Sequence, residues 1–146
     1  NYMLERFGQA IDQSQTLELL DLQYCNTLNQ LPLVISQLKE NRSLKTINLN
    51  FCNIHLQLEE IIAHLTSLKE LKVSGNLIGH HLDKLQDVLA KNSNLELLEM
   101  DHVNLPVHFF NFLHQNTTLR ELKAMPKQNE VNTIIAILES QQGLQV

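Results

Sequence analysis

The sequence predicts an α/β solenoid in which short parallel strands line the concave face and α-helices cover the convex face. The first observation is that 29 of the 146 residues are leucine, and that similar segments open at regularly spaced leucines. The second is the spacing of 24 to 27 residues, which is enough for one strand and one helix. Units of this size that each bury one face against the next stack into a solenoid. The five segments begin at Leu17, Leu44, Leu68, Leu95 and Leu119.

The first part of each segment has the pattern of a strand. The openings read LELLDLQYCN, LKTINLNFCN, LKELKVSGNL, LELLEMDHVN and LRELKAMPKQ. Counting the opening leucine as position 0, positions 3 and 5 are apolar, with Ala124 as the smallest member. Residues two apart face the same side of a strand, so positions 2, 4 and 6 face the opposite side. The strands are expected to be parallel because each helix returns the chain to the same edge.

The second part of each segment has apolar residues at helical spacing. The residues concerned are Leu31, Val34, Ile35 and Leu38; Leu82, Leu85, Val88 and Leu89; Phe110 and Leu113; and Val131, Ile134, Ile135 and Leu138. The two 24-residue segments, which begin at Leu44 and Leu95, are expected to have a shorter or more irregular convex part. A polar residue three before the opening leucine, as at Asn41, Asn92 and Asn116, is expected to bond the backbone where it turns from helix to strand.

We expect a single domain over residues 1–146. Residues 1–16 are expected to form the helical half of an earlier repeat or a cap, with Leu4, Phe7 and Ile11 on one face, and a further repeat begins at Leu144. Neither end has the polar capping segment that a solenoid needs for solubility. The expectation is therefore a fragment of a longer array.

Five segments in register over nearly the whole chain follow the template LxxLxLxx(N/C), well in four of them and weakly in the fifth, and this pattern resembles that of leucine-rich-repeat proteins. The repeat length and the helix signals look most like the ribonuclease-inhibitor-like class. This resemblance implies a horseshoe-shaped array that binds a protein through its concave face and has no catalytic activity. Asn and Gln together make up 28 residues, similar to the amide-rich repeat proteins that intracellular bacteria deliver into host cells. One implied identity is therefore a bacterial effector.

Composition excludes several function classes. A net charge of −5 and a pI near 5.8 argue against a nucleic-acid binder, which needs a broad basic face. No apolar run approaches the roughly 18 residues of a membrane span, and no signal peptide opens the chain. The asparagines of the two N-x-S/T triplets, Asn41 and Asn116, are explained by their place in the repeat rather than by glycosylation. We expect an intracellular, cytoplasmic protein that needs no cofactor. If the chain is a bacterial effector, it is expected to be delivered into the cytosol of a host cell.

The residue types that carry chemistry show no catalytic or metal-binding spacing. Cys25 and Cys52 occupy position 8 of adjacent repeats, where buried, reduced thiols are expected, and a disulfide between them remains an alternative. Seven histidines occur without an HxxxH or HExxH spacing, and no CxxC is present. No phosphate-binding glycine loop or nucleophile elbow is visible. We therefore expect neither an enzyme nor a metal site.

The concave face is the predicted binding site for a protein partner. Tyr24 and Phe51 lie at position 7 of neighbouring repeats, and exposed aromatic side chains at such a rim are typical anchors, although they could instead cover the core. Charges of both signs suit a specific protein surface better than a phosphate backbone. Charge reversal at Lys72 or Glu99 is expected to weaken binding without lowering the melting temperature. The predicted partner-binding residues are Leu19, Asp21, Tyr24, Asn48, Phe51, Lys72, Glu99, Asp101 and His102.

Two further alternatives remain open from the sequence. The chain can be a structural or regulatory array that associates with itself through its uncapped ends. It can also be a module that serves a catalytic domain encoded outside this chain. Fold alone does not decide between these functions and protein binding.

Overall fold

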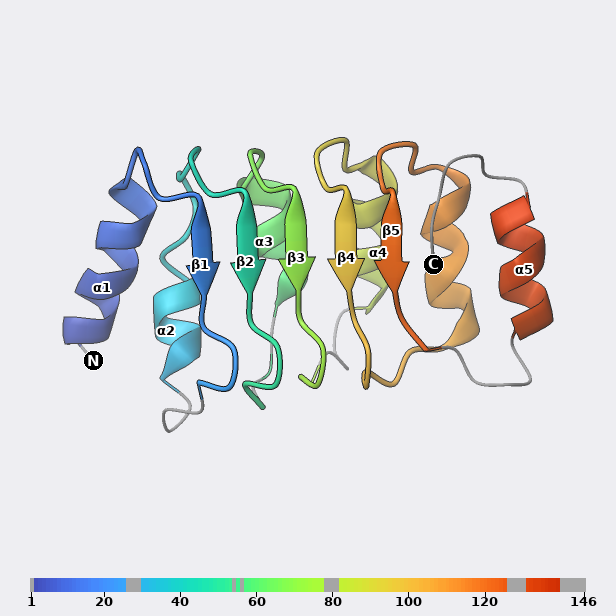
Figure 1. Ribbon diagram of the computed structural model, residues 1–146, viewed down its shortest axis with the longest axis horizontal. Helices are drawn as coiled ribbons and strands as arrows, with labels where there is room; N and C mark the ends of the chain where they lie inside the picture. The colour runs from blue at the N-terminus through green and yellow to red at the C-terminus, as the bar shows by residue number, and fades with distance from the viewer. Residues whose placement is uncertain are drawn as a thin grey trace.

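The computed structural model describes residues 2–25, 30–53, 55, 57–77, 82–125 and 131–139. Within these ranges strands and helices alternate along the chain (Figure 1). The strands are β1 (Leu19–Asp21), β2 (Thr46–Asn48), β3 (Glu70–Lys72), β4 (Leu97–Glu99) and β5 (Glu121–Lys123). The helices are α1 (Tyr2–Gln13), α2 (Leu31–Ile35), α3 (Leu58–His64), α4 (Leu82–Lys91), the 3₁₀ helix η1 (Val107–His114) and α5 (Val131–Glu139).

The five strands form one parallel sheet in chain order, β1-β2-β3-β4-β5. Every strand covers positions 2 to 4 of its segment, and equivalent positions pair: Leu20 lies opposite Ile47, and Ile47 opposite Leu71. The predicted parallel arrangement, with one strand for each repeat, is therefore what the structure shows. Figure 1 shows the sheet as one layer, with α3 and α4 behind it and α1 and α5 beyond its two ends.

The core lies between the sheet and the helices. The position 3 residue of every strand is buried and belongs to the core, whereas positions 2 and 4 are more exposed on most strands. The position 3 residues are Leu20, Ile47, Leu71, Leu98 and Leu122. Helix residues close the core from the other side, among them Val34, Ile61, Leu85 and Phe109. The period-2 pattern thus separates a core side from an open side, as the sequence predicts.

An asparagine three residues before the opening leucine forms the turn from helix to strand in three of the five segments, at Asn41, Asn92 and Asn116. Asn41 is buried, and its Nδ2 donates to the carbonyl oxygens of Ile11, at 2.9 Å, and Ser14, at 3.0 Å. Its Oδ1 accepts from the backbone N–H groups of Ser43, at 2.9 Å, and Leu44, at 2.7 Å. Asn116 repeats this set of four bonds three segments later. One side chain therefore fastens two neighbouring repeats, as the sequence predicts.

The helical layer is less regular than the sheet. The segment at Leu95 has a 3₁₀ helix, in line with the predicted irregularity, but the shortest helix, α2 with five residues, lies in a 27-residue segment. The prediction tied irregularity to segment length, whereas α2 begins at Leu31-Pro32 and lasts little more than a turn. Most neighbouring helices pack together; α2 and α3 are the exception, because their described residues make little contact.

Two predicted helix faces need correction. On α1 the buried residues are Gly8 and Ile11, and Phe7 is exposed. Gly8 allows this close approach, because a Cβ there would lie 2.6 Å from the Val34 carbonyl oxygen. On α5 the buried pair is Ile134 and Ile137, and the predicted Ile135 is exposed. In each case other members of the predicted face still pack on the core, namely Leu4 and Ile11 on α1 and Ile134 and Leu138 on α5.

The predicted repeat at Leu144 lies outside the described residues. Among the helices that the structure describes, none is long and apolar enough to cross a membrane.

Candidate functional site on the open sheet face

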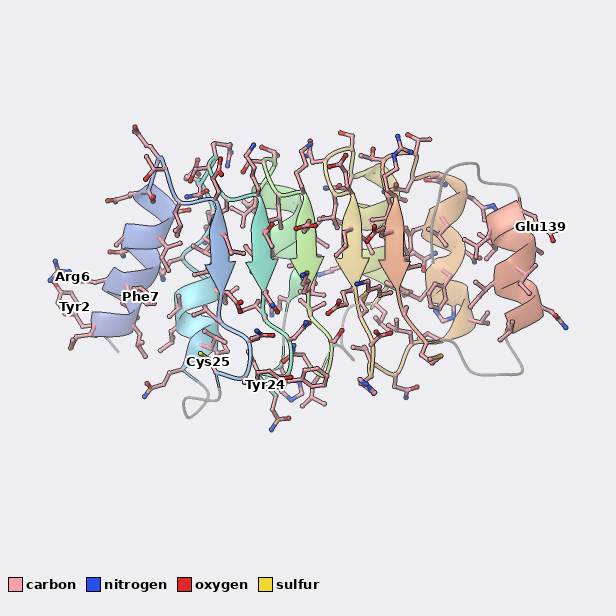
Figure 2. The ribbon with its side chains drawn as sticks, in the orientation of Figure 1. Tyr2, Arg6, Phe7, Tyr24, Cys25 and Glu139 are labelled. Carbon is pink, nitrogen blue, oxygen red and sulfur yellow. The ribbon has the colours of Figure 1, made fainter. Side chains whose placement is uncertain are left out.

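The side of the sheet that no helix covers is the candidate site, here called the open face. It consists of positions 2, 4 and 6 of the five segments, together with position 7 at the carboxyl ends of the strands. Positions 2, 4 and 6 hold Leu19, Asp21, Gln23, Thr46, Asn48, Asn50, Glu70, Lys72, Ser74, Leu97, Glu99, Asp101, Glu121, Lys123 and Met125. Figure 2 shows Tyr24, from position 7, beyond the carboxyl ends of β1 and β2.

Tyr24, Phe51 and His102 form a row of rings along this edge, here called the aromatic row. The Tyr24 and Phe51 rings are parallel, with an interplanar angle of 9° and centres 5.6 Å apart. The Phe51 and His102 rings are tilted by 48° with centres 5.8 Å apart. Tyr24 is 69% exposed and Phe51 40%, so neither ring serves to cover the core. The sequence allowed these rings either to be exposed or to cover the core. The structure has them exposed, so a partner can reach both.

Backbone hydrogen bonds extend the sheet into this row. The N–H of Tyr24 donates to the Asn50 carbonyl at 2.9 Å, and that of Phe51 donates to the Ser74 carbonyl at 2.7 Å. The N–H of Gly75 donates in the same way to the Asp101 carbonyl at 2.9 Å. Position 7 of one repeat is thus tied to position 6 of the next, which fixes the spacing of the rings.

The aromatic row has an unfavourable backbone conformation. Tyr24, Phe51 and His102 have φ angles of 61°, 56° and 59°, in the left-handed region. Residues other than Gly, Asn and Asp rarely adopt this region, because their Cβ crowds the following carbonyl. Gly75, with φ of 70°, is the residue that this position favours on conformational grounds. The bulky rings are therefore not explained by backbone preference, and strain of this kind clusters at functional sites.

Gly75 also makes the aromatic row continuous. It holds position 7 of the segment between Phe51 and His102, and a Cβ there would overlap the Phe51 ring. Because Gly75 has no side chain, the Phe51 ring extends over it and meets His102 two repeats away. A glycine that interrupts a column of rings is the sequence signal for this arrangement, although the repeat spacing alone does not predict the contact between Phe51 and His102.

A polar network fills the middle of the open face. Asn50 Nδ2 donates to Glu99 Oε2 at 2.5 Å, and Asn50 Oδ1 accepts from the Ser74 N–H at 2.8 Å. Ser74 Oγ lies 3.4 Å from Glu99 Oε2 and accepts from the Asp101 N–H at 2.9 Å. Lys123 Nζ lies 3.6 Å from the other Glu99 oxygen. Asn50 and Ser74 were absent from the predicted site because each is an ordinary polar residue whose role depends on its neighbours in space.

The predicted site residues all lie on this face, but with different accessibility. Leu19 is 57% exposed, whereas Leu97 in the same column is 8% exposed. Asp21 and His102 are exposed, and Lys72 and Asp101 are half-buried.

Two of the predicted contact residues need correction, because the structure engages them within the chain. Asn48 is buried, and its Oδ1 accepts from the Asn50 N–H at 3.0 Å. The Glu99 side chain is only 15% exposed and serves the polar network. Both side chains therefore form hydrogen bonds within the open face in the unbound chain.

The cysteines lie behind this edge and are free thiols. Cys52 is buried, and its Sγ donates to the Leu22 carbonyl at 3.0 Å, while Cys25 is half-buried. Burial raises the pKa of the Cys52 thiol, more than hydrogen bonds from the backbone of Cys25 and Tyr24 lower it. The structure has both cysteines as free thiols, but the predicted burial holds for Cys52 alone, because Cys25 is half-buried.

A hollow lies on the helical side, where α2 and α3 fail to pack. Its volume is about 560 Å³, and apolar residues including Ile35, Leu38 and Ile61 line it together with the polar residues Lys39 and His64. This size falls within the range of small-molecule sites, roughly 300–1,000 Å³. Among the residues that the structure describes, no group of three or more His, Cys, Asp or Glu side chains could hold a metal ion.

Solved structures with the same architecture provide the comparison. The C-terminal domain of tropomodulin from Caenorhabditis elegans matches with a TM-score of 0.72 and 13% sequence identity, over 95% of this chain and 91% of that one. Actin-binding site 2 of leiomodin-1 matches with a TM-score of 0.71 and 16% identity, over 94% and 87%. This chain resembles both in fold. No family model and no curated protein matches the sequence.

These neighbours correct the class suggested by the resemblance. The α/β fold with its parallel five-stranded sheet is compatible with a leucine-rich-repeat type, but the matching structures are tropomodulin and leiomodin domains. The assignment to the ribonuclease-inhibitor-like class, and with it the bacterial effector, is wrong. Repeat length and helix signals suggested that class, and amide content suggested the effector. None of these properties records how the helical layer packs. Neither neighbour is named as an enzyme.

Proposed function

We propose that this chain is a non-catalytic, leucine-rich-repeat binding module that recognises a protein partner with the open face. The observation that carries the proposal is the aromatic row. Tyr24 and Phe51 occupy a backbone conformation that disfavours bulky side chains, and they expose 69% and 40% of their surface. Their rings stack, and the row continues to the tilted ring of His102 two repeats further on. Exposed aromatic side chains on a rigid scaffold are typical anchors of protein interfaces.

Actin is the first partner to test. The leiomodin-1 domain that shares the fold is named as an actin-binding site, and its likeness covers nearly all of this chain. A cytoplasmic setting fits this proposal. The cysteines are free, and the asparagines of both N-x-S/T triplets, Asn41 and Asn116, are buried and bonded to backbone.

The test compares two variants that each remove two exposed aromatic side chains. Tyr24→Ala/Phe51→Ala alters the open face, and Tyr2→Ala/Phe7→Ala alters α1 at the end of the stack (Figure 2). Binding is measured by cosedimentation with filamentous actin and by affinity capture from cell lysate, and circular dichroism checks folding. We expect the open-face variant to lose its partner and the α1 variant to retain it. Retention by both folded variants would move the site away from the open face.

Self-association is a second candidate, favoured by the outer face of α1. Tyr2, Met3 and Phe7 are exposed there, and Arg6 lies over the Tyr2 ring with its Cζ 5.7 Å from the ring centre. Light scattering after size-exclusion chromatography measures this directly. An oligomer that the Tyr2→Ala/Phe7→Ala variant converts to a monomer would support association through this end. A monomer at all concentrations would remove the candidate.

A further inference from the structure

The open face carries an excess of negative charge. Positions 2, 4 and 6 hold five carboxylates and two lysines, which gives a net charge of −3 on this face. The carboxylates are those of Asp21, Glu70, Glu99, Asp101 and Glu121. Glu99 is largely buried and paired with Lys123, so its charge is compensated within the chain. The outward charge therefore comes mainly from the other four carboxylates, set against Lys72 alone.

Two of these carboxylates lie next to the aromatic row. Asp21 is exposed and precedes Tyr24 by three residues at the end of β1. Asp101 is the neighbour of His102, and its carbonyl accepts from the Gly75 N–H. The rings and the carboxylates thus share one edge of the sheet. Ring faces attract cations through their quadrupole, and carboxylates pair with the same cations.

We propose that the partner binds this edge with a basic segment, in which arginine side chains stack on Tyr24 and Phe51 and pair with Asp21 and Asp101. The inference rests on the proposed function of the open face and specifies the chemistry of the partner. Arginine suits the site better than lysine because its planar guanidinium stacks on a ring and bonds a carboxylate at the same time. The chain shows the same contact internally, with Arg6 over Tyr2.

The test uses fluorescently labelled hexa-arginine, hexa-lysine and hexa-glutamate peptides, with binding followed by anisotropy at low ionic strength. Asp21→Asn/Asp101→Asn removes two charges from the edge and keeps the side-chain shape. The matched control, Asp83→Asn/Asp87→Asn, removes two charges from exposed positions of α4. Tyr24→Leu/Phe51→Leu removes the rings and keeps every charge.

We expect hexa-arginine to bind more tightly than hexa-lysine, and hexa-glutamate not to bind. The edge-charge variant and the ring variant should each bind hexa-arginine roughly three- to tenfold more weakly. The α4 control should bind as the unaltered chain does. Equal weakening by the edge and α4 variants would mean attraction to net charge alone and would overturn the inference, as would undiminished binding by the ring variant.

Failure of this inference is distinguishable from failure of the proposed function. The protein partner could be lost with Tyr24→Ala/Phe51→Ala while the edge-charge and ring variants bind hexa-arginine as tightly as the unaltered chain does. That result would mean that the open face binds a partner that is not basic. If the protein partner is also retained, the open face is not the binding site and both proposals are wrong.

Discussion

The ring of Phe51 fills the space that a side chain at Gly75 would need. A Cβ built on Gly75 would overlap Phe51 Cδ1 and lie 2.6 Å from Cε1. The two residues hold the same position in neighbouring repeats, and the left-handed φ of 70° at Gly75 independently favours glycine. The conformation of the most central ring in the aromatic row thus depends on a missing side chain in the next repeat.

Gly75→Ala is expected to lower the free energy of unfolding by about 2 to 4 kcal/mol, from backbone strain and overlap together. Urea denaturation measures the change. In the double variant Phe51→Ala/Gly75→Ala the overlap is gone and only the strain remains. The two substitutions should therefore be coupled by at least about 1 kcal/mol. Additive effects would contradict the contact.

Tyr24→Gly is expected to change stability by less than about 1 kcal/mol. Loss of the stacked ring destabilises by about 0.5 to 1.5 kcal/mol, and relief of the left-handed conformation offsets it by a similar amount. Partner binding should nevertheless fall, because the exposed ring is removed. Leu98→Ala in the core serves as the reference and should cost about 2 to 5 kcal/mol. A comparably large loss for Tyr24→Gly would show that the ring is structural.

Asn41→Ala should destabilise the chain by about 2 to 4 kcal/mol, because four backbone hydrogen bonds, two buried and two part-buried, are lost at once. Asn92 occupies the same place in the repeat but is half-buried and accepts only from the N–H groups of Asn94 and Leu95 in the described structure. Asn92→Ala should therefore lower the free energy of unfolding clearly less than Asn41→Ala does. Thermal melting of the two variants measures which one is destabilised more. Equal decreases in melting temperature would contradict the prediction.

Glu99→Lys is expected to lower the melting temperature, contrary to the expectation from the sequence. The substitution places a cation near Lys123 and leaves Asn50 Nδ2 without its acceptor. Lys72→Glu, on the neighbouring strand, is the control that should leave the melting temperature nearly unchanged. A stable Glu99→Lys variant would mean that the polar network adds little to folding.

The Cys52 thiol should make stability depend on pH in the alkaline range. Its pKa is raised in the folded chain, so the folded state holds the proton more tightly than the unfolded state does. Its contribution is fully present below the ordinary thiol pKa of about 8.5 and is lost as the pH rises through the folded value. Urea denaturation from pH 7 to 10 should show a steeper decline for the unaltered chain than for Cys52→Ala. Parallel curves would indicate that burial does not perturb this thiol.

The sheet was predictable because one repeated pattern defines it five times. The apolar residues at positions 3 and 5 specify the face of each strand, and the asparagine at Asn41 and its equivalents specifies the turn before it. The helical layer was less predictable, because the side chains that bury a helix depend on its neighbours. Phe7 fits the helical period as well as Gly8 does, and only the close approach of the Val34 carbonyl selects the glycine side.

The candidate site was predictable in its location but not in its internal contacts. Repeat columns place Tyr24, Phe51 and His102 at one edge, and this much follows from alignment of the segments. The link between Asn50 and Glu99 joins residues 49 positions apart in different columns, so no periodicity reveals it. The same holds for Phe51 and His102, whose contact depends on the ring crossing an intervening repeat.

The sparse contact between α2 and α3 has a mechanical consequence. The sheet is continuous from β1 to β5, whereas the layer behind it is interrupted at this one place in the described structure. Bending stiffness is therefore unequal along the stack, and a load applied to its two ends should open the α2–α3 side first. The sheet would then bend between β1 and β2, in front of the gap between α2 and α3. Curvature could then change between the first repeat and the rest without any hydrogen bond of the sheet being broken.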